Sequence, residues 1–162
     1  QGGLVKPRPM PLAALALAGA KHILVPNLAN LGLTPDFIAQ GPIAQAGGLA
    51  LTTAFNAGLA QALAQVEMTL GVDVIPVDIF AAQNSIIANA GAFGFTNTTT
   101  ACIATPDVFT GCTGYVFFDG LHPTTAAHSL LAFQFAAAVP LPAPAVLFVA
   151  GALLLRRARR RA

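Results

Sequence analysis

Two short apolar runs, separated by a long stretch of helical periodicity, constrain the fold of this chain more than any other feature. The runs are residues 22–25 (HILV) and residues 72–77 (VDVIPV), and each is bounded by turn-forming residues, which suits strands buried on both faces. From about residue 43 to residue 70, large apolar residues recur at steps of three or four, which predicts a helix. They are Leu51, Phe55, Leu59, Leu63, Val66 and Leu70. The order strand–helix–strand predicts parallel strands joined by a crossover, and therefore an α/β fold.

Other helices are expected around this unit. Composition predicts them over residues 12–20, over about residues 79–89, and from Pro123 to about Ala138. Residues 91–114 are predicted to be a long irregular segment, and such loops in compact domains are usually functional or braced. Two strands are fewer than a doubly wound domain needs. The chain also begins at Gln1 without a signal-peptide pattern, so we expect a fragment that lacks its N-terminal part.

Charge and composition exclude several classes of function. Five of the eight basic residues lie in the last seven positions, which leaves residues 1–155 with three basic against six acidic residues. A nucleic-acid-binding protein needs a basic surface to neutralise phosphates, so no nucleic-acid partner is expected. Two cysteines are too few for a zinc finger. His128 follows His122 by six residues, which is not the spacing that brings two metal ligands onto one helix face, and neither a metal nor a cofactor is expected.

The strongest chemical signal is the segment 117–128 (FFDGLHPTTAAH). His122 precedes a proline, which disfavours helical backbone and predicts that the imidazole lies on a turn, with Pro123 as the first helical residue. Asp119, on the same turn, can reach the ring. A carboxylate that accepts from one ring nitrogen fixes the tautomer and leaves the other nitrogen free to act as a base. Taken alone, the pattern also fits a helix start with a surface histidine and a turn aspartate.

Five stretches in the same order together resemble the SGNH hydrolases, also called GDSL lipases or esterases. They are residues 20–27 with 31–35 (AKHILVPN, LGLTP), Phe55-Asn56 with the leucines that follow, residues 77–80 (VDIF), Gly94-Phe95 with the cysteines of the loop, and the Asp119–Pro123 block. The likeness covers about residues 12–138. It implies an α/β fold of three layers (α/β/α, flavodoxin-like) with parallel strands. It also implies a serine ester hydrolase in which His122 is the general base and acid and Asp119 orients it.

The nucleophile that this resemblance implies is not evident in the chain. Its two serines, Ser85 and Ser129, lie in predicted helices, and neither belongs to a G-D-S-L block or a G-x-S-x-G elbow. The G-x-N-D block that would supply oxyanion donors is also missing. Residues 1–138 are therefore expected to be the C-terminal portion of an SGNH domain, inactive by themselves.

Cys102 and Cys112 flank nine residues of the loop that leads to His122. If the protein is exported, a disulfide between them would brace this loop. Two free thiols are the alternative.

Residues 139–162 form a separate unit, in which the proline motif VPLPA is followed by an apolar stretch and terminal arginines. This order resembles the PEP-CTERM sorting signals of Gram-negative bacteria. The resemblance implies a hydrophobic helix that holds an exported protein in the inner membrane until an exosortase removes it and the protein reaches the cell surface or the medium. A plain C-terminal anchor is the alternative.

The sequence thus predicts an exported SGNH-type hydrolase of carboxylic esters, such as lipids or acylated saccharides. The alternative is a non-catalytic surface module that keeps a remnant of the hydrolase fold and the tail.

Overall fold

The fold is built on a parallel strand–helix–strand unit, as the apolar runs predict. The computed structural model describes residues 11–139. Within this range the sheet consists of β1 (His22–Pro26) and β2 (Asp73–Val77), which pair in parallel with His22 opposite Asp73 and Pro26 opposite Val77. The α/β class and the parallel strands are therefore confirmed.

The helices agree closely with the sequence-based expectations, with one addition. They are α1 (Pro11–Leu17), α2 (Pro35–Ala39), α3 (Pro42–Leu70), α4 (Ile79–Ala88) and α5 (Thr125–Ala138). The addition is α2, which lies in a turn-rich stretch and is too short to produce a periodic pattern. The α3 helix ends where expected, because Gly71 adopts a left-handed conformation (φ 62°, ψ 32°) that glycine tolerates without strain.

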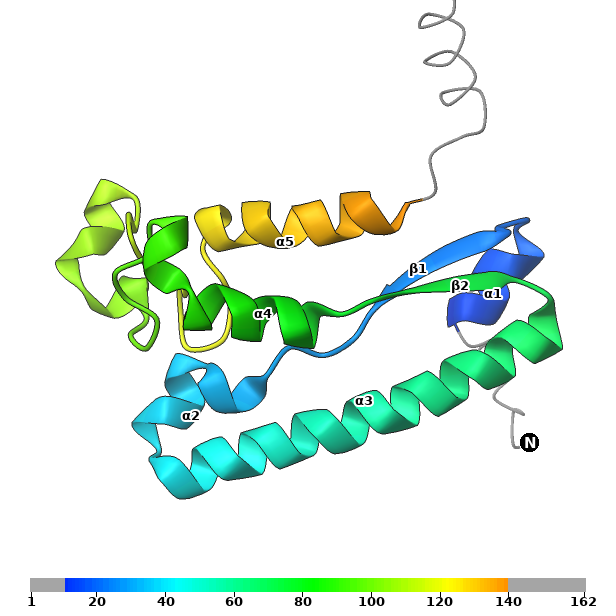
Figure 1. The fold of residues 1–162 in the computed structure, drawn as a ribbon, viewed down its shortest axis with the longest axis horizontal. Coiled ribbons are helices and arrows are strands. Elements are labelled where there is room, and N and C mark those ends of the chain that lie inside the picture. Colours follow the sequence, from blue (N-terminus) through cyan, green and yellow to red (C-terminus); the bar gives the residue numbers. More distant parts are fainter. Residues whose placement is uncertain (1–10, 140–162) are drawn as a thin grey trace, which may run out of the picture.

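Helix α3 covers one face of the strands, whereas Leu24, Val25 and Ile75 stay partly exposed, so the strands are not buried on both faces as the apolar runs predict. Figure 1 shows α3 running along one side of β1 and β2, and α5 lying beside α4 and reaching only the ends of the strands next to α4. A core cluster of Ile23, Val72 and Val74 packs against Leu63 and Val66 of α3. Ile86 of α4 and Ala127 of α5 belong to a second cluster, which includes Phe117. The second cluster anchors the segment just before Asp119 in the protein interior.

The first half of α3 buries a different face from the predicted one. Leu51 and Phe55 are exposed, whereas Thr52 is fully buried. The cause is hydrogen bonding, because the Asn56 side chain accepts from the Leu28 amide at 2.8 Å and donates to the Leu28 carbonyl at 2.9 Å. Thr52 Oγ1 accepts from the amide of Leu31 at 3.2 Å. The polar face of α3 therefore fixes the segment that follows β1.

Residues 91–114 are irregular, as expected, and three short 3-10 helices lie in or beside this segment. These are η2 (Ala90–Phe93), η3 (Cys102–Ala104) and η4 (Pro106–Thr110); a further one, η1 (Leu31–Leu33), precedes α2. Cys102 and Cys112 form a disulfide and, with Tyr115, make a small buried cluster. The Tyr115 hydroxyl donates to Asp107 at 2.8 Å, which closes the loop a second time.

The start of α5 differs from the prediction by two residues. Pro123 was expected to be the first helical residue, but the helix begins at Thr125 and Thr124 is its N-cap, whose side chain accepts from the Ala127 amide. Threonine is a good N-cap residue, and Pro123 instead pairs with Phe117 in an isolated antiparallel bridge. The N-cap therefore begins the helix after the histidine turn.

The proposed hydrophobic helix and sorting motif cover residues 139–162, and all of these except Val139 lie outside the described residues, as do residues 1–10. Among the helices between Pro11 and Val139, none combines the length and the apolar character that crossing a membrane requires.

Candidate active site

Residues 118–123 form a tight turn that presents His122. Its ends are closed by a hydrogen bond from the Phe118 amide to the His122 carbonyl, at 2.8 Å. Thr124 fixes the far side of the turn, because its amide donates to the Val116 carbonyl and its hydroxyl donates to the Tyr115 carbonyl, both at 2.8 Å. The turn is therefore held between a buried segment and a helix N-cap, which gives the imidazole a rigid support.

His122 and Asp119 are brought together as the sequence predicted. His122 Nδ1 lies 2.8 Å from Asp119 Oδ2 and 3.1 Å from Oδ1. The imidazole side chain is 70% exposed and the carboxylate 35% exposed. An ionised carboxylate only accepts hydrogen bonds, so Nδ1 carries the proton in the neutral ring and Nε2 keeps a free lone pair. This is the arrangement a general base requires.

The backbone of the turn keeps Asp119 ionised. The amides of His122 and Leu121 donate to Asp119 Oδ1, at 2.6 Å and 2.8 Å. These two backbone hydrogen bonds, followed by the side-chain bond to His122, lower the pKa of Asp119 from 3.8 to about 2. The carboxylate is therefore charged, and able to orient the ring, at any pH at which an imidazole is a base.

Gly120 and Asp36 connect this turn to α2. The Asp36 amide donates to the Gly120 carbonyl at 3.0 Å. The Asp36 carboxylate packs so closely on Gly120 that an added Cβ would overlap both of its oxygens. An alanine at position 120 would therefore force the exposed Asp36 side chain to rotate away from the turn. The sequence analysis did not assign this contact, because no local pattern links two residues so far apart in the chain.

A second histidine–aspartate pair lies at the opposite end of the sheet. His22 Nδ1 is 2.9 Å from Asp73 Oδ2, and both side chains are largely exposed. Both residues open their strands, whereas ligands of open α/β sheets bind at the carboxyl ends of the strands. Geometry alone therefore does not mark a histidine–aspartate pair as functional, and the His22 pair offers an internal control.

The carboxyl ends of the strands are joined by a polar network. Asn27, directly after β1, donates to Asp78 at 2.8 Å and accepts from the Phe80 amide at 2.9 Å. Asp78 is the N-cap of α4, since its side chain accepts from the Ala81 amide. These bonds fix the start of α4 against the end of β1.

Neither serine forms a hydrogen bond with His122 or Asp119. Ser129 lies on α5 and its hydroxyl donates to the Thr125 carbonyl one turn earlier, at 3.0 Å. Ser85 lies within α4. Across residues 11–139, no group of three or more His, Cys, Asp or Glu side chains is placed to hold a metal ion.

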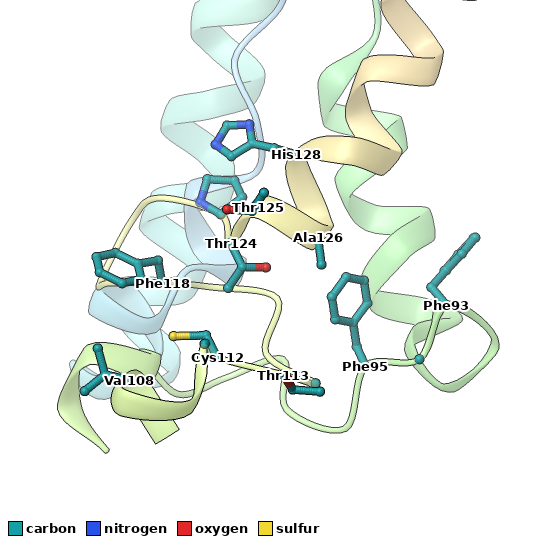
Figure 2. A pocket seen from close by; sticks show the side chains of 14 residues that line it. Phe93, Phe95, Val108, Cys112, Thr113, Phe118, Thr124, Thr125, Ala126 and His128 are labelled. Carbon is teal, nitrogen blue, oxygen red and sulfur yellow. The ribbon is translucent and has the colours of Figure 1, made fainter. Parts of the chain in front are cut away.

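Two hollows lie beside the histidine turn, and Pro123 lines both. One has a volume of about 490 Å³ and is lined by Phe118 and Pro123 among others. Figure 2 shows the Phe118 and Phe95 rings below the first turn of α5, with the Thr124 side chain between them. The other has a volume of about 650 Å³ and includes Leu121 and Pro123, with Gln83 of α4 in its wall. Gln83 was not singled out by the sequence analysis, because a lone glutamine in a helix carries no motif.

The chain was compared with known proteins. The model of the family described as GDSL-like Lipase/Acylhydrolase matches residues 9–135. A GDSL esterase/lipase of Arabidopsis thaliana is 29% identical over 140 residues, which covers 75% of this chain and 38% of the relative. The chain thus spans well under half the length of this curated relative.

Proposed function

Because the chain belongs to the GDSL-like lipase/acylhydrolase family, we propose that it supplies the histidine and the aspartate of a serine hydrolase of carboxylic esters. The observation that carries the proposal is the 2.8 Å contact between His122 Nδ1 and Asp119 Oδ2, on a turn that leaves the imidazole exposed. The family implies the reaction class, and the geometry supports the assignment of roles to these residues.

The proposed mechanism follows the serine–histidine–aspartate pattern. His122 Nε2 removes the proton from a serine hydroxyl while its oxygen attacks the ester carbonyl, and the imidazolium then protonates the departing alcohol. Water hydrolyses the acyl-enzyme in the same way, with His122 again acting first as base and then as acid. Asp119 accepts from Nδ1 throughout and stabilises the imidazolium without taking its proton.

The serine is proposed to come from polypeptide outside these 162 residues. Ser129 bonds its own helix and Ser85 lies on α4, so neither is placed at an exposed turn beside His122. In this proposal residues 1–138 are the C-terminal portion of a three-layer, flavodoxin-like SGNH domain. The strands that would extend the sheet and the oxyanion donors are proposed to lie in the same polypeptide segment as the serine.

Residues 139–162 are proposed to be a PEP-CTERM-like sorting tail. The proposal is supported by the order of the proline motif, the apolar stretch and the arginines in the sequence. An exported protein would be held in the inner membrane of a Gram-negative bacterium by this tail, processed by an exosortase, and delivered to the cell surface or the medium. Intact mass spectrometry of the surface form tests this, since loss of the apolar stretch and the arginines together is expected, and a form still ending in Ala162 contradicts it.

A fluorophosphonate probe tests the hydrolase proposal directly. Such a probe reacts with a serine activated by a histidine base, forming an oxygen–phosphorus bond and releasing fluoride. In the whole protein that contains this chain, we expect the labelled serine to be neither Ser85 nor Ser129, and labelling to be lost in His122→Ala. Labelling of Ser85 or Ser129, or unchanged labelling of His122→Ala, would overturn the assignment.

A further inference from the structure

We propose that the smaller of the two hollows beside the histidine turn binds a neutral saccharide unit. This inference goes beyond the proposed hydrolase function, because it concerns binding and does not require His122 to act as a base. The hollow has a volume of about 490 Å³, which is within the usual range for small-molecule sites. Its walls are the first turn of α5, the segment 93–95 and the loop that the disulfide closes, as Figure 2 shows.

The walls of this hollow carry no side chain of Asp, Glu, Lys or Arg. Between Ile79 and Val139, the only residues of these four types are Asp107 and Asp119. Asp107 accepts from the Tyr115 hydroxyl, and Asp119 is engaged within the histidine turn. A charged ligand would therefore lose hydration in this hollow without gaining an opposite charge, which favours a neutral ligand.

Two accessible aromatic rings and two accessible hydroxyls line the hollow. Phe93 and Phe118 are 43% and 40% exposed, whereas Phe95 is buried. The negative face of an aromatic ring attracts the C–H groups that form one face of a pyranose ring. Thr113 and Thr125 are exposed, and each hydroxyl can both donate and accept, as the hydroxyls of a sugar can. The walls therefore offer partners to both the apolar and the polar parts of a saccharide.

The same walls are a poorer match for a hydrocarbon chain. An alkyl chain would remove the hydroxyls of Thr113 and Thr125 from water without replacing their hydrogen bonds, which costs free energy. A saccharide replaces those bonds with its own hydroxyls and still covers the rings. The mixture of groups thus favours a ligand that has one apolar face and a rim of hydroxyls.

The walls are held in place by the protein itself. Phe95 belongs to a buried core cluster, and the next residue, Thr96, donates its amide to the Gly114 carbonyl at 2.8 Å. This bond ties the segment 93–95 to the opposite wall, which the disulfide between Cys102 and Cys112 braces. A site that is already formed loses little conformational entropy on binding, which favours a ligand that makes only weak individual contacts.

The position of the hollow places the saccharide beside the candidate active site and not in it. Phe118 and Pro123, the two ends of the histidine turn, line the hollow, whereas His122 itself does not. A saccharide polymer bound there would lie next to the turn and leave the imidazole accessible. The inferred role is therefore to hold the protein on a neutral polysaccharide.

An array of immobilised oligosaccharides, probed with the whole protein that contains this chain, tests the inference without requiring hydrolysis. The array carries neutral oligosaccharides together with oligogalacturonates as acidic members, and we expect binding to neutral members only. Ala126 is exposed in the first turn of α5 and lines the hollow, so Ala126→Trp should fill the space and abolish binding. The control is Ala136→Trp, at an exposed position of the same helix that does not line the hollow, and it should bind like wild type.

Phe93→Leu and Phe118→Leu distinguish contact with a ring face from general apolar contact. Each variant keeps an apolar side chain but removes the ring, so the affinity for the best-bound neutral oligosaccharide should fall about fivefold in isothermal titration calorimetry. Phe109→Leu is the control, because Phe109 is 91% exposed and does not line the hollow. Undiminished affinity in the first two variants, or an equal loss in all three, would overturn the role of the rings.

Two results would overturn the site itself. One is the absence of binding to every neutral member of the array, including the case in which other polypeptide of the whole protein fills the hollow and Ala126→Trp melts at a lower temperature than Ala136→Trp. The other is an equal effect of Ala126→Trp and Ala136→Trp on binding. Because no ester bond is broken in this experiment, its outcome is independent of whether His122 acts as the base.

Discussion

At the scale of single residues, hydrogen bonds to both carboxylate oxygens of Asp119 hold the histidine turn in place. The backbone amides of His122 and Leu121 hold one carboxylate oxygen, and the imidazole holds the other. These bonds require the ionised form of Asp119, which links the stability of the turn to pH.

The low pKa of Asp119 predicts a loss of stability at acidic pH. Because the folded pKa of about 2 is below the ordinary 3.8, the contribution is fully present above about pH 4 and disappears as pH falls toward 2. The difference in melting temperature between wild type and Asp119→Asn should therefore shrink over this interval. Thermal unfolding of both proteins from pH 7 to pH 2 measures it, and a difference that does not change with pH would contradict the assigned cause.

Gly120→Ala is predicted to destabilise the protein by about 1 kcal/mol, the low end of the cost of overpacking. The added Cβ would overlap the Asp36 carboxylate, which is the exposed end of a side chain and has to rotate away. Asp36→Ala removes those oxygens, so the same glycine substitution should cost clearly less in that background. Denaturant unfolding of the four proteins in this double-mutant cycle checks the prediction, and equal costs in both backgrounds would contradict it.

At the scale of elements, local patterns predicted most of the fold, and long-range contacts account for the rest. The strands, α3 and α5 could be predicted, because apolar period and flanking glycine or proline are local properties. The buried face in the first half of α3 could not be predicted, because Thr52 and Asn56 are polar and become buried only by forming hydrogen bonds with the segment after β1.

In the candidate site, the contact between Asp119 and His122 could be predicted, because the two residues lie three positions apart in the sequence. Gly120 with Asp36, and the position of Gln83 in the wall of the larger hollow, depend on tertiary packing.

The disulfide between Cys102 and Cys112 braces the loop that ends near Asp119. It closes a loop of sequence separation 10, so removing it should destabilise the protein by roughly 2–3 kcal/mol. The variant carrying both Cys102→Ala and Cys112→Ala should melt at a lower temperature than wild type. A thiol reductant should lower the wild-type melting temperature and leave that of the double variant unchanged. Free thiols detected by alkylation of non-reduced protein would contradict the bond.

At the scale of the whole molecule, the described sheet has two strands and therefore two unpaired edges. Sheets of this size are marginally stable in water, and an apolar edge invites association. Large apolar side chains are also exposed, among them Leu17, Ile43 and Phe133. These features support the proposal that further strands complete the domain.

The 162-residue chain expressed by itself is predicted to have low stability and no esterase activity. It presents a base and its orienting carboxylate, but its two serines lie on helices. Differential scanning calorimetry and an ester assay on this chain check both parts. A cooperative transition well above room temperature together with turnover above background would contradict them.

The central claim is that His122 is the acid–base residue of an ester hydrolase, and hydrolysis of p-nitrophenyl butyrate by the whole protein that contains this chain tests it most directly. His122→Ala should lower kcat/KM by at least about a hundredfold, because an unassisted serine is a weak nucleophile at neutral pH. His22→Ala, which removes the other histidine bonded to an aspartate, should leave kcat/KM unchanged. Wild-type turnover in His122→Ala, or an equal loss in both variants, would contradict the account.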